Sequence, residues 1–247
     1  MCNAFSAIVG RNRKVYWKLG IDEHEGLRKE FKLKDTENLC PIEINPNNDD
    51  YIFPDKWNFK FDDKIPDWWK QSHEKASWDA HKRWNKELRK KVHINRLRNI
   101  IHPFKLPKVN KPTKTDLNNL KEWDSVWDSV WASVLASVWA SVWNSVGNSV
   151  WASVGDSVWD SVLDSVGASV LDSVGTSVWA YIGWNFNLKR SEWKYTKQIK
   201  TKDYPFMPLI KLWKRGIVPS FDGRVWRLHS GKKADIIFEI SREELSK

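Results

Sequence analysis

The sequence has little cysteine and no long apolar run. Its 247 residues include only Cys2 and Cys40, too few for a disulfide framework or a zinc cluster. No eighteen consecutive residues are apolar, and the N-terminus lacks the basic-then-apolar layout of a signal peptide. We therefore expect no membrane contact and a cytoplasmic location, which would be the host cytoplasm if the protein is viral.

Motifs that hold nucleotides or metals are also missing. The chain has no Walker loop, no Rossmann glycine pattern, no His-Glu-x-x-His and no paired Cys-x-x-Cys. We accordingly expect neither a cofactor nor a metal.

What the chain does have is a tetrapeptide repeated fifteen times over residues 124–183. Its form is Asp/Ala/Asn-Ser-Val-Trp/Leu/Gly, and fourteen copies keep the Ser-Val pair. A strict short period indicates a stacked element. The constant Val is typical of a close-packed interior, whereas a slot that exchanges Trp for Gly predicts a position outside the core or at a corner.

The period of four favours a β-solenoid over a helix. In one continuous helix, each repeat would rotate the Val row by about 40°, so the row would circle the rod within about nine repeats. The repeat resembles the pentapeptide-repeat proteins, which form a four-sided β-helix, although its unit is one residue shorter. We therefore expect a mainly β fold, a tetrapeptide-repeat β-solenoid capped by small α+β segments. A helical or irregular rod is the alternative.

The flanks predict ordinary α+β structure. We expect an α+β region at 1–102, a Pro/Lys-rich linker at 103–123, the solenoid at 124–183 and an α+β cap at 184–247. Turn signals and periodicity predict hairpins at 4–19 and 217–228, strands at 41–44, 57–61 and 234–240, and helices after Asp22, at 67–92 and at 204–215. In Met1–Ser6 and Val218–Gly223 the flanks resemble uncharacterised bacteriophage and bacterial proteins, a resemblance that implies a source and no chemistry.

Positive charge concentrates in the flanks. The repeat carries six Asp and no Lys or Arg, so the flanks account for more than the chain's formal net charge of +10. The stretch from Lys82 to Lys114 is densest, and such a cluster can neutralise phosphates while an aromatic ring stacks on bases. A solvated helix followed by a linker is the alternative. The predicted nucleic-acid-binding residues are Arg83, Trp84, Lys86, Arg89, Lys90, Lys91, Arg96 and Arg98.

Three smaller constellations could carry chemistry. If Met1 is removed, Cys2 would combine a thiol and an α-amine, as in N-terminal-nucleophile amidohydrolases. His24, with Asp22, Glu23 and Glu25 beside it, could offer a base or a ligand. A cationic hairpin end could bind an anion through Arg224, Arg227, His229 and Lys232.

The tryptophans of the repeat suggest an interaction surface. Stacked indoles facing solvent usually mark a contact with another molecule, a second copy of the chain or a flank folded back over them. The predicted surface comprises Trp127, Trp131, Trp139, Trp143, Trp151 and Trp159.

The expected function is non-enzymatic binding. The partner would be a host macromolecule or nucleic acid, with self-association through the Trp-bearing face also possible. The alternatives are an enzyme using Cys2 and a DNA-mimicking solenoid, the latter weakened by the few Asp of the repeat.

Overall fold

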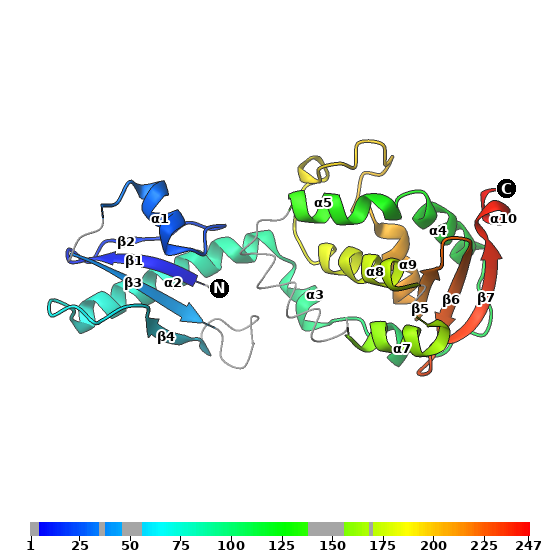
Figure 1. The fold of residues 1–247 in the computed structure, drawn as a ribbon, viewed down its shortest axis with the longest axis horizontal. Helices are drawn as coiled ribbons and strands as arrows, with labels where there is room; N and C mark the ends of the chain where they lie inside the picture. Colours follow the sequence, from blue (N-terminus) through cyan, green and yellow to red (C-terminus); the bar gives the residue numbers. More distant parts are fainter. Residues whose placement is uncertain (1–4, 35–37, 46–55, 138–155, 168–169) are drawn as a thin grey trace. The chain divides into compact units, whose positions relative to one another are not determined.

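The computed structural model describes residues 5–34, 38–45, 56–137, 156–167 and 170–247 (Figure 1). They form two compact units, which are considered separately. The N-terminal unit holds the described residues up to Ile94, and the C-terminal unit holds those from Asn95 onward.

The N-terminal unit is built on a four-stranded antiparallel sheet. The strand order is β2-β1-β3-β4, and the central strand β1 is buried along its whole length. The predicted hairpin and short strands are confirmed. The bounds are β1 Phe5–Gly10, β2 Val15–Tyr16, β3 Leu39–Asn45 and β4 Asn58–Phe61.

Two helices pack on this sheet, α1 (His24–Phe31) and α2 (Gln71–Lys91). The ring of Phe5 contacts His81 and Trp84 of α2 at 5.3 and 5.7 Å. Neighbouring residues of a strand face opposite sides of the sheet, so Ser6 faces away from the side of Phe5. The hydroxyl of Ser6 donates to the carbonyl of Asp22, just before α1. One face of the sheet is therefore aromatic and covered by α2, and the other lies towards α1.

The C-terminal unit combines helices with a three-stranded antiparallel sheet in the order β5-β6-β7. Its Asp222-Gly223 turn confirms the predicted hairpin, because Gly223 takes the positive φ of 94° that such a turn needs. The bounds are α3 Ile94–Arg98, which begins at the unit boundary, η2 Pro103–Lys105, α4 Lys114–Asp124, η3 Trp127–Ser129, α5 Val130–Ser137, α7 Asp156–Val166, α8 Leu171–Gly183, η6 Arg190–Glu192, α9 Met207–Lys214, β5 Ile217–Phe221, β6 Val225–Ser230, β7 Asp235–Ser241 and α10 Arg242–Ser246. Residues 103–123, predicted to be a linker, thus carry η2 and α4.

The described part of the repeat is helical apart from Ser125, Val126 and Gly167, so the predicted β-solenoid, the mainly β fold and the structural likeness to pentapeptide-repeat proteins are wrong. Copies of the tetrapeptide form α5, α7 and α8, and the protein is α+β. The rotation of about 40° per repeat excludes only one unbroken helix. These helices have 8, 11 and 13 residues, so each spans only two or three repeats and its Val row turns by about 120° at most.

The prediction that Val faces the core is confirmed for the described copies. All but Val166 of α7, which is half-buried, have exposed fractions between 0%, as at Val130, Val162 and Val174, and 8% at Val126. A breaking residue keeps the helices short: Gly167 follows α7 with φ of 79°, and its amide donates to the carbonyl of Leu163 at 2.7 Å. This left-handed position is the usual end of a helix at glycine.

The constant Ser supports the helical form as well. The Ser177 hydroxyl donates to the carbonyl of Ser173 one turn back, at 3.0 Å. The Ser173 hydroxyl donates to the carbonyl of Val170 and accepts the amide of Phe221 in β5, at 2.9 and 2.8 Å. A helix can therefore bury these hydroxyls with their hydrogen bonds made.

The fourth slot of the repeat is not uniformly outside. Trp131 and Leu135 are 53% and 47% exposed, as the sequence predicts. Gly183 is buried, however, and a Cβ there would collide with the hydroxyl of Tyr204, which donates to the carbonyl of Ala180 at 2.6 Å. At this copy glycine is required by close packing rather than by a corner.

Candidate functional site

The outward side of α2 carries a basic face, made by Lys82, Arg83, Lys86, Arg89 and Lys90. Lys82, Arg83, Lys86 and Lys90 are exposed. They recur every three or four residues, so they lie on adjacent turns over about 12 Å of helix. Arg89 is half-buried, and its Nε donates to the Asn85 side chain at 3.3 Å.

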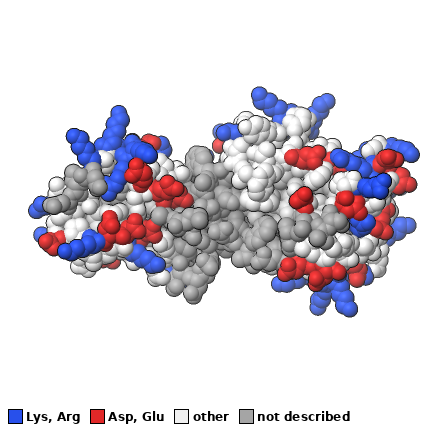
Figure 2. Space-filling view, viewed as in Figure 1, with Lys and Arg blue, Asp and Glu red and all other residues white. Residues whose placement is uncertain are grey.

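The basic face is only lightly neutralised. The Nζ of Lys90 lies 2.7 Å from Glu87, an exposed pair of low strength. Within the described part of the chain, Lys82, Arg83 and Lys86 make no ion pair. Figure 2 shows one side of the molecule, on which lysine and arginine are interspersed with acidic groups on both units.

Trp84 does not belong to this surface, which corrects the prediction that it stacks on bases. It is 3% exposed and packs against the rings of Phe5, Trp57 and His81, each with centroids 5.7 Å away. The reason is its phase on α2. Trp84 follows buried Ala80 by one turn and so lies on the face that covers the sheet.

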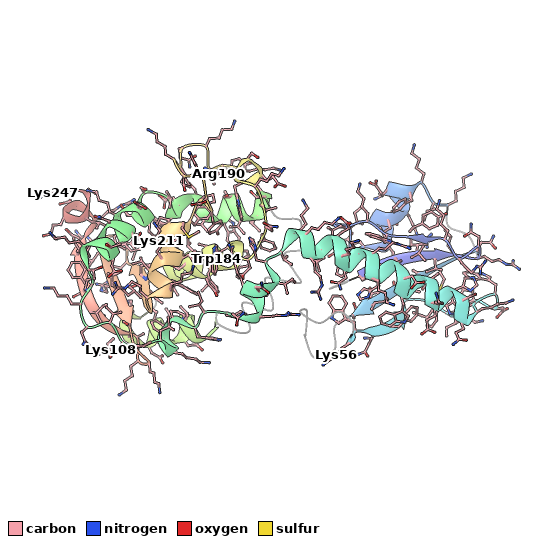
Figure 3. The ribbon with its side chains drawn as sticks, turned by 180° about the vertical axis from the view of Figure 1, so that it is seen from behind. Lys56, Lys108, Trp184, Arg190, Lys211 and Lys247 are labelled. Atoms are coloured by element: carbon pink, nitrogen blue, oxygen red, sulfur yellow. The ribbon has the colours of Figure 1, made fainter. Side chains whose placement is uncertain are left out.

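Arg96 and Arg98 are not part of the basic face either, because both belong to the C-terminal unit. The guanidinium of Arg96 donates to the carbonyl of Trp184 and lies 4.2 Å from the centre of its ring. Trp184, labelled in Figure 3, directly follows α8. Burial lowers the pKa of Arg96. This residue is therefore held in a packing contact, while Arg98 is exposed.

The predicted anion site at the C-terminal hairpin is not assembled. Arg224 and Lys232 are exposed, but they lie beyond opposite ends of β6. Arg227 is paired within the sheet, its guanidinium 2.6 Å from Asp222 and 2.8 Å from Glu239. His229 is fully buried. Strand geometry separates the four residues, so they cannot surround one anion.

His229 instead forms a buried polar pair with Ser220. Its Nε2 lies 2.7 Å from the Ser220 hydroxyl, and its Nδ1 lies 2.9 Å from the carbonyl of Ala234. Because a carbonyl only accepts, Nδ1 carries the proton and Nε2 accepts from Ser220. Both side chains are 0% exposed, so the pair stabilises the sheet and cannot reach a substrate.

We expect this pair to make the protein less stable in mild acid. Burial lowers the pKa of His229 below its ordinary value, so the unfolded chain binds the proton more readily. The stabilisation is complete above about pH 6.5 and decreases as the pH falls towards the folded-state pKa. The free energy of unfolding, measured with urea, should decrease less from pH 7.5 to pH 5.5 for His229→Gln than for the wild type. Equal losses in the two proteins would contradict the assignment.

The Trp surface is only partly described. Trp127 is half-buried against Phe221 and Trp226, with ring centroids 5.9 and 6.1 Å away. Trp131 is exposed and meets Trp179 edge to face at 4.4 Å. The remaining predicted members lie outside the described residues or, for Trp159, have a side chain outside them: Trp139, Trp143, Trp151 and Trp159. Cys2, the predicted nucleophile, also lies outside them.

A cluster that the sequence did not indicate lies on the α1 side of the N-terminal sheet. His24 lies close to Glu43 of β3 and to Asp62, which directly follows β4. Its sequence neighbours Asp22, Glu23 and Glu25, which the sequence suggests as partners, are not in this group. One ligand atom from each of the three residues lies within 4.8 Å of the others. Successive members are 19 residues apart in sequence, so no short spacing motif could reveal them.

Comparison with protein-family models, curated proteins and solved structures gives no significant match. Among the described helices, none combines the length and the apolar character needed to span a bilayer. The function must therefore be inferred from the side chains themselves.

Proposed function

We propose that the protein binds nucleic acid non-enzymatically, through the basic face of α2. The observation that carries this is the exposure of Lys82, Arg83, Lys86 and Lys90 on adjacent turns, where the Lys90–Glu87 ion pair is itself exposed. The buried aromatic face of α2 fixes the helix to its sheet, so the charges project from a rigid support. A cytoplasmic location is part of the proposal.

The proposed binding is electrostatic and independent of base sequence. Lysine and arginine on a helix surface contact phosphates, and each phosphate neutralised releases counterions. About four such contacts predict a loss of affinity on the order of 100-fold between 50 and 200 mM salt. Trp84, the ring predicted to stack on bases, is buried and cannot make that contact. We therefore expect duplex and single strands to be bound alike.

Reversing the charge of this face should abolish the binding. The variant Arg83→Glu, Lys86→Glu, Lys90→Glu should bind a labelled DNA duplex at least tenfold more weakly at 50 mM salt, because favourable phosphate contacts become repulsive. Fluorescence anisotropy measures the affinity. A matched control reverses Lys29, Lys32 and Lys34, exposed lysines at and just beyond the end of α1, with the same change in net charge.

The affinity of the control for the duplex should lie within about threefold of that of the wild type, once the long-range effect of its altered net charge is taken into account. An equal loss in both variants would show that net charge alone acts, and absence of wild-type binding at 50 mM salt would refute the proposal. The DNA-mimic alternative depended on a solenoid and is withdrawn with it. No described residue favours the Cys2 enzyme.

A further inference from the structure

We propose that His24, Glu43 and Asp62 form a binding site for a first-row divalent metal ion such as Zn²⁺, Co²⁺ or Mn²⁺. The site lies in the N-terminal unit and is independent of the proposed nucleic-acid binding. Three separate elements supply it: His24 is the first residue of α1, Glu43 lies within β3, and Asp62 directly follows β4.

His24 directs one ring nitrogen to a backbone carbonyl and the other to the carboxylates. Its Nε2 lies 3.1 Å from the carbonyl of Ile42. A carbonyl can only accept, so Nε2 carries a hydrogen, and Nδ1 is the nitrogen placed to ligate a metal. This arrangement, with one ring nitrogen donating to a backbone carbonyl and the other left for the metal, is usual for metal-binding histidines.

The second ring nitrogen of His24 faces the carboxylates. The Nδ1 of His24 lies 3.0 Å from Oδ2 of Asp62, and a carboxylate of Glu43 is in the same group. Two acceptors at this distance repel unless a cation or a proton lies with them. The His24 side chain is 12% exposed, so water screens this contact less than it would on an open surface.

The spacing and donor types fit a small divalent ion. Metal bonds of about 2.1 Å to nitrogen and oxygen place neighbouring ligands about 3.0 Å apart and opposite ones about 4.2 Å apart. The three ligand atoms lie within 4.8 Å of one another, so side-chain rotations would bring them to these separations around an ion. One imidazole with two carboxylates favours transition metals over Ca²⁺ and Mg²⁺, which prefer oxygen alone.

A second layer of contacts holds the ligands. The Asn45 amide donates to Oε2 of Glu43 at 2.8 Å, which fixes one oxygen of that carboxylate. The strand pairing places Ile42 opposite Phe61, so the carbonyl that orients His24 belongs to the same strand pair that carries both carboxylates. The sheet thus defines the distance between the groups before any ion binds. Water would complete the coordination.

The test is metal binding by the full chain in the presence of the metal alone. Titration with Co²⁺ or Zn²⁺, followed by calorimetry and by Co²⁺ visible absorption, should reveal one tight site. His24→Ala, Glu43→Gln and Asp62→Asn should each weaken it at least tenfold. Asp63→Asn, a change of the same type at the next exposed residue, should leave the affinity within about twofold of the wild type.

Two outcomes would overturn the proposal. One is absence of binding by the wild type. The other is equal affinity in wild type and Asp62→Asn, which would place the metal elsewhere. Asp62 is half-exposed, so Asp62→Asn should keep the fold, and circular dichroism without metal verifies this. The NMR signals of His24 should shift when the metal is added.

Discussion

Replacing Val174 by aspartate should unfold the C-terminal unit under conditions in which the wild type is folded. Val174 is 0% exposed in α8 and belongs to the constant row of the repeat. The substitution removes apolar contacts and places a carboxylate in a close-packed interior, with an expected loss of at least about 4 kcal/mol. Urea unfolding followed by far-UV circular dichroism measures the free energy of unfolding.

The matched control for this change is Leu135→Asp. Leu135 is also a repeat residue, in the fourth slot of α5, but it is 47% exposed. An aspartate there stays hydrated, so the loss should be no more than about 1 kcal/mol. Similar losses at the two positions would contradict the helical arrangement, because burial is the only property expected to separate them.

The second large effect should follow removal of the indole of Trp226. This residue is 0% exposed in β6, its ring stacks on Phe221 with centroids 4.6 Å apart, and its Nε1 donates to Asp124 at 2.8 Å. Trp226→Ala leaves a cavity and should cost about 3–5 kcal/mol in the free energy of unfolding. Denaturant titration monitored by far-UV circular dichroism provides the measurement.

Two companion variants separate packing from the hydrogen bond. Trp226→Phe keeps much of the ring but leaves one oxygen of Asp124 without its indole partner, so it should lose less than Trp226→Ala. Asp124 retains Arg242 at 2.9 Å, which limits that loss. Trp131→Ala removes an indole that is 53% exposed and should cost about 1 kcal/mol. A loss for Trp131→Ala as large as that for Trp226→Ala would show that burial does not set the order.

The flanks were predictable because their signals are local. The Asp222-Gly223 turn and the apolar spacing of α2 act over a few residues, and both specify structure without reference to distant parts of the chain. The same spacing predicts that Trp84 is buried, because Trp84 lies on the same face of α2 as Ala80 and Leu88. The prediction that its ring stacks on bases did not take this periodicity into account.

The repeat could not be assigned for a physical reason. Its period of four is compatible with a helix only when the helix ends before the Val row drifts out of the core. Where helices end depends on particular residues such as Gly167, whose left-handed backbone is visible only in three dimensions. The sequence correctly predicts that the Val positions are buried, but it does not predict the length of each helix, which keeps those positions on the core side.

The two candidate sites also differ in how far local sequence signals predict them. The basic face of α2 follows from charge and helical phase, so most of its residues were predicted. His24, Glu43 and Asp62 come together only through the pairing of β3 with β4 and the position of α1. Neither pairing partners nor helix placement can be read from one sequence, and the expectation that no metal binds rested on short motifs alone.

The helical form of the repeat restricts how its gene can change in length. Tandem copies gain or lose whole units during replication, and one added unit inside α8 would lengthen that helix by about 6 Å and rotate everything after it by about 40°. A duplication that includes a terminating glycine such as Gly167 adds a complete helix and leaves the phase of the next one unchanged. Inheritable changes in copy number should therefore occur in blocks that end at glycine.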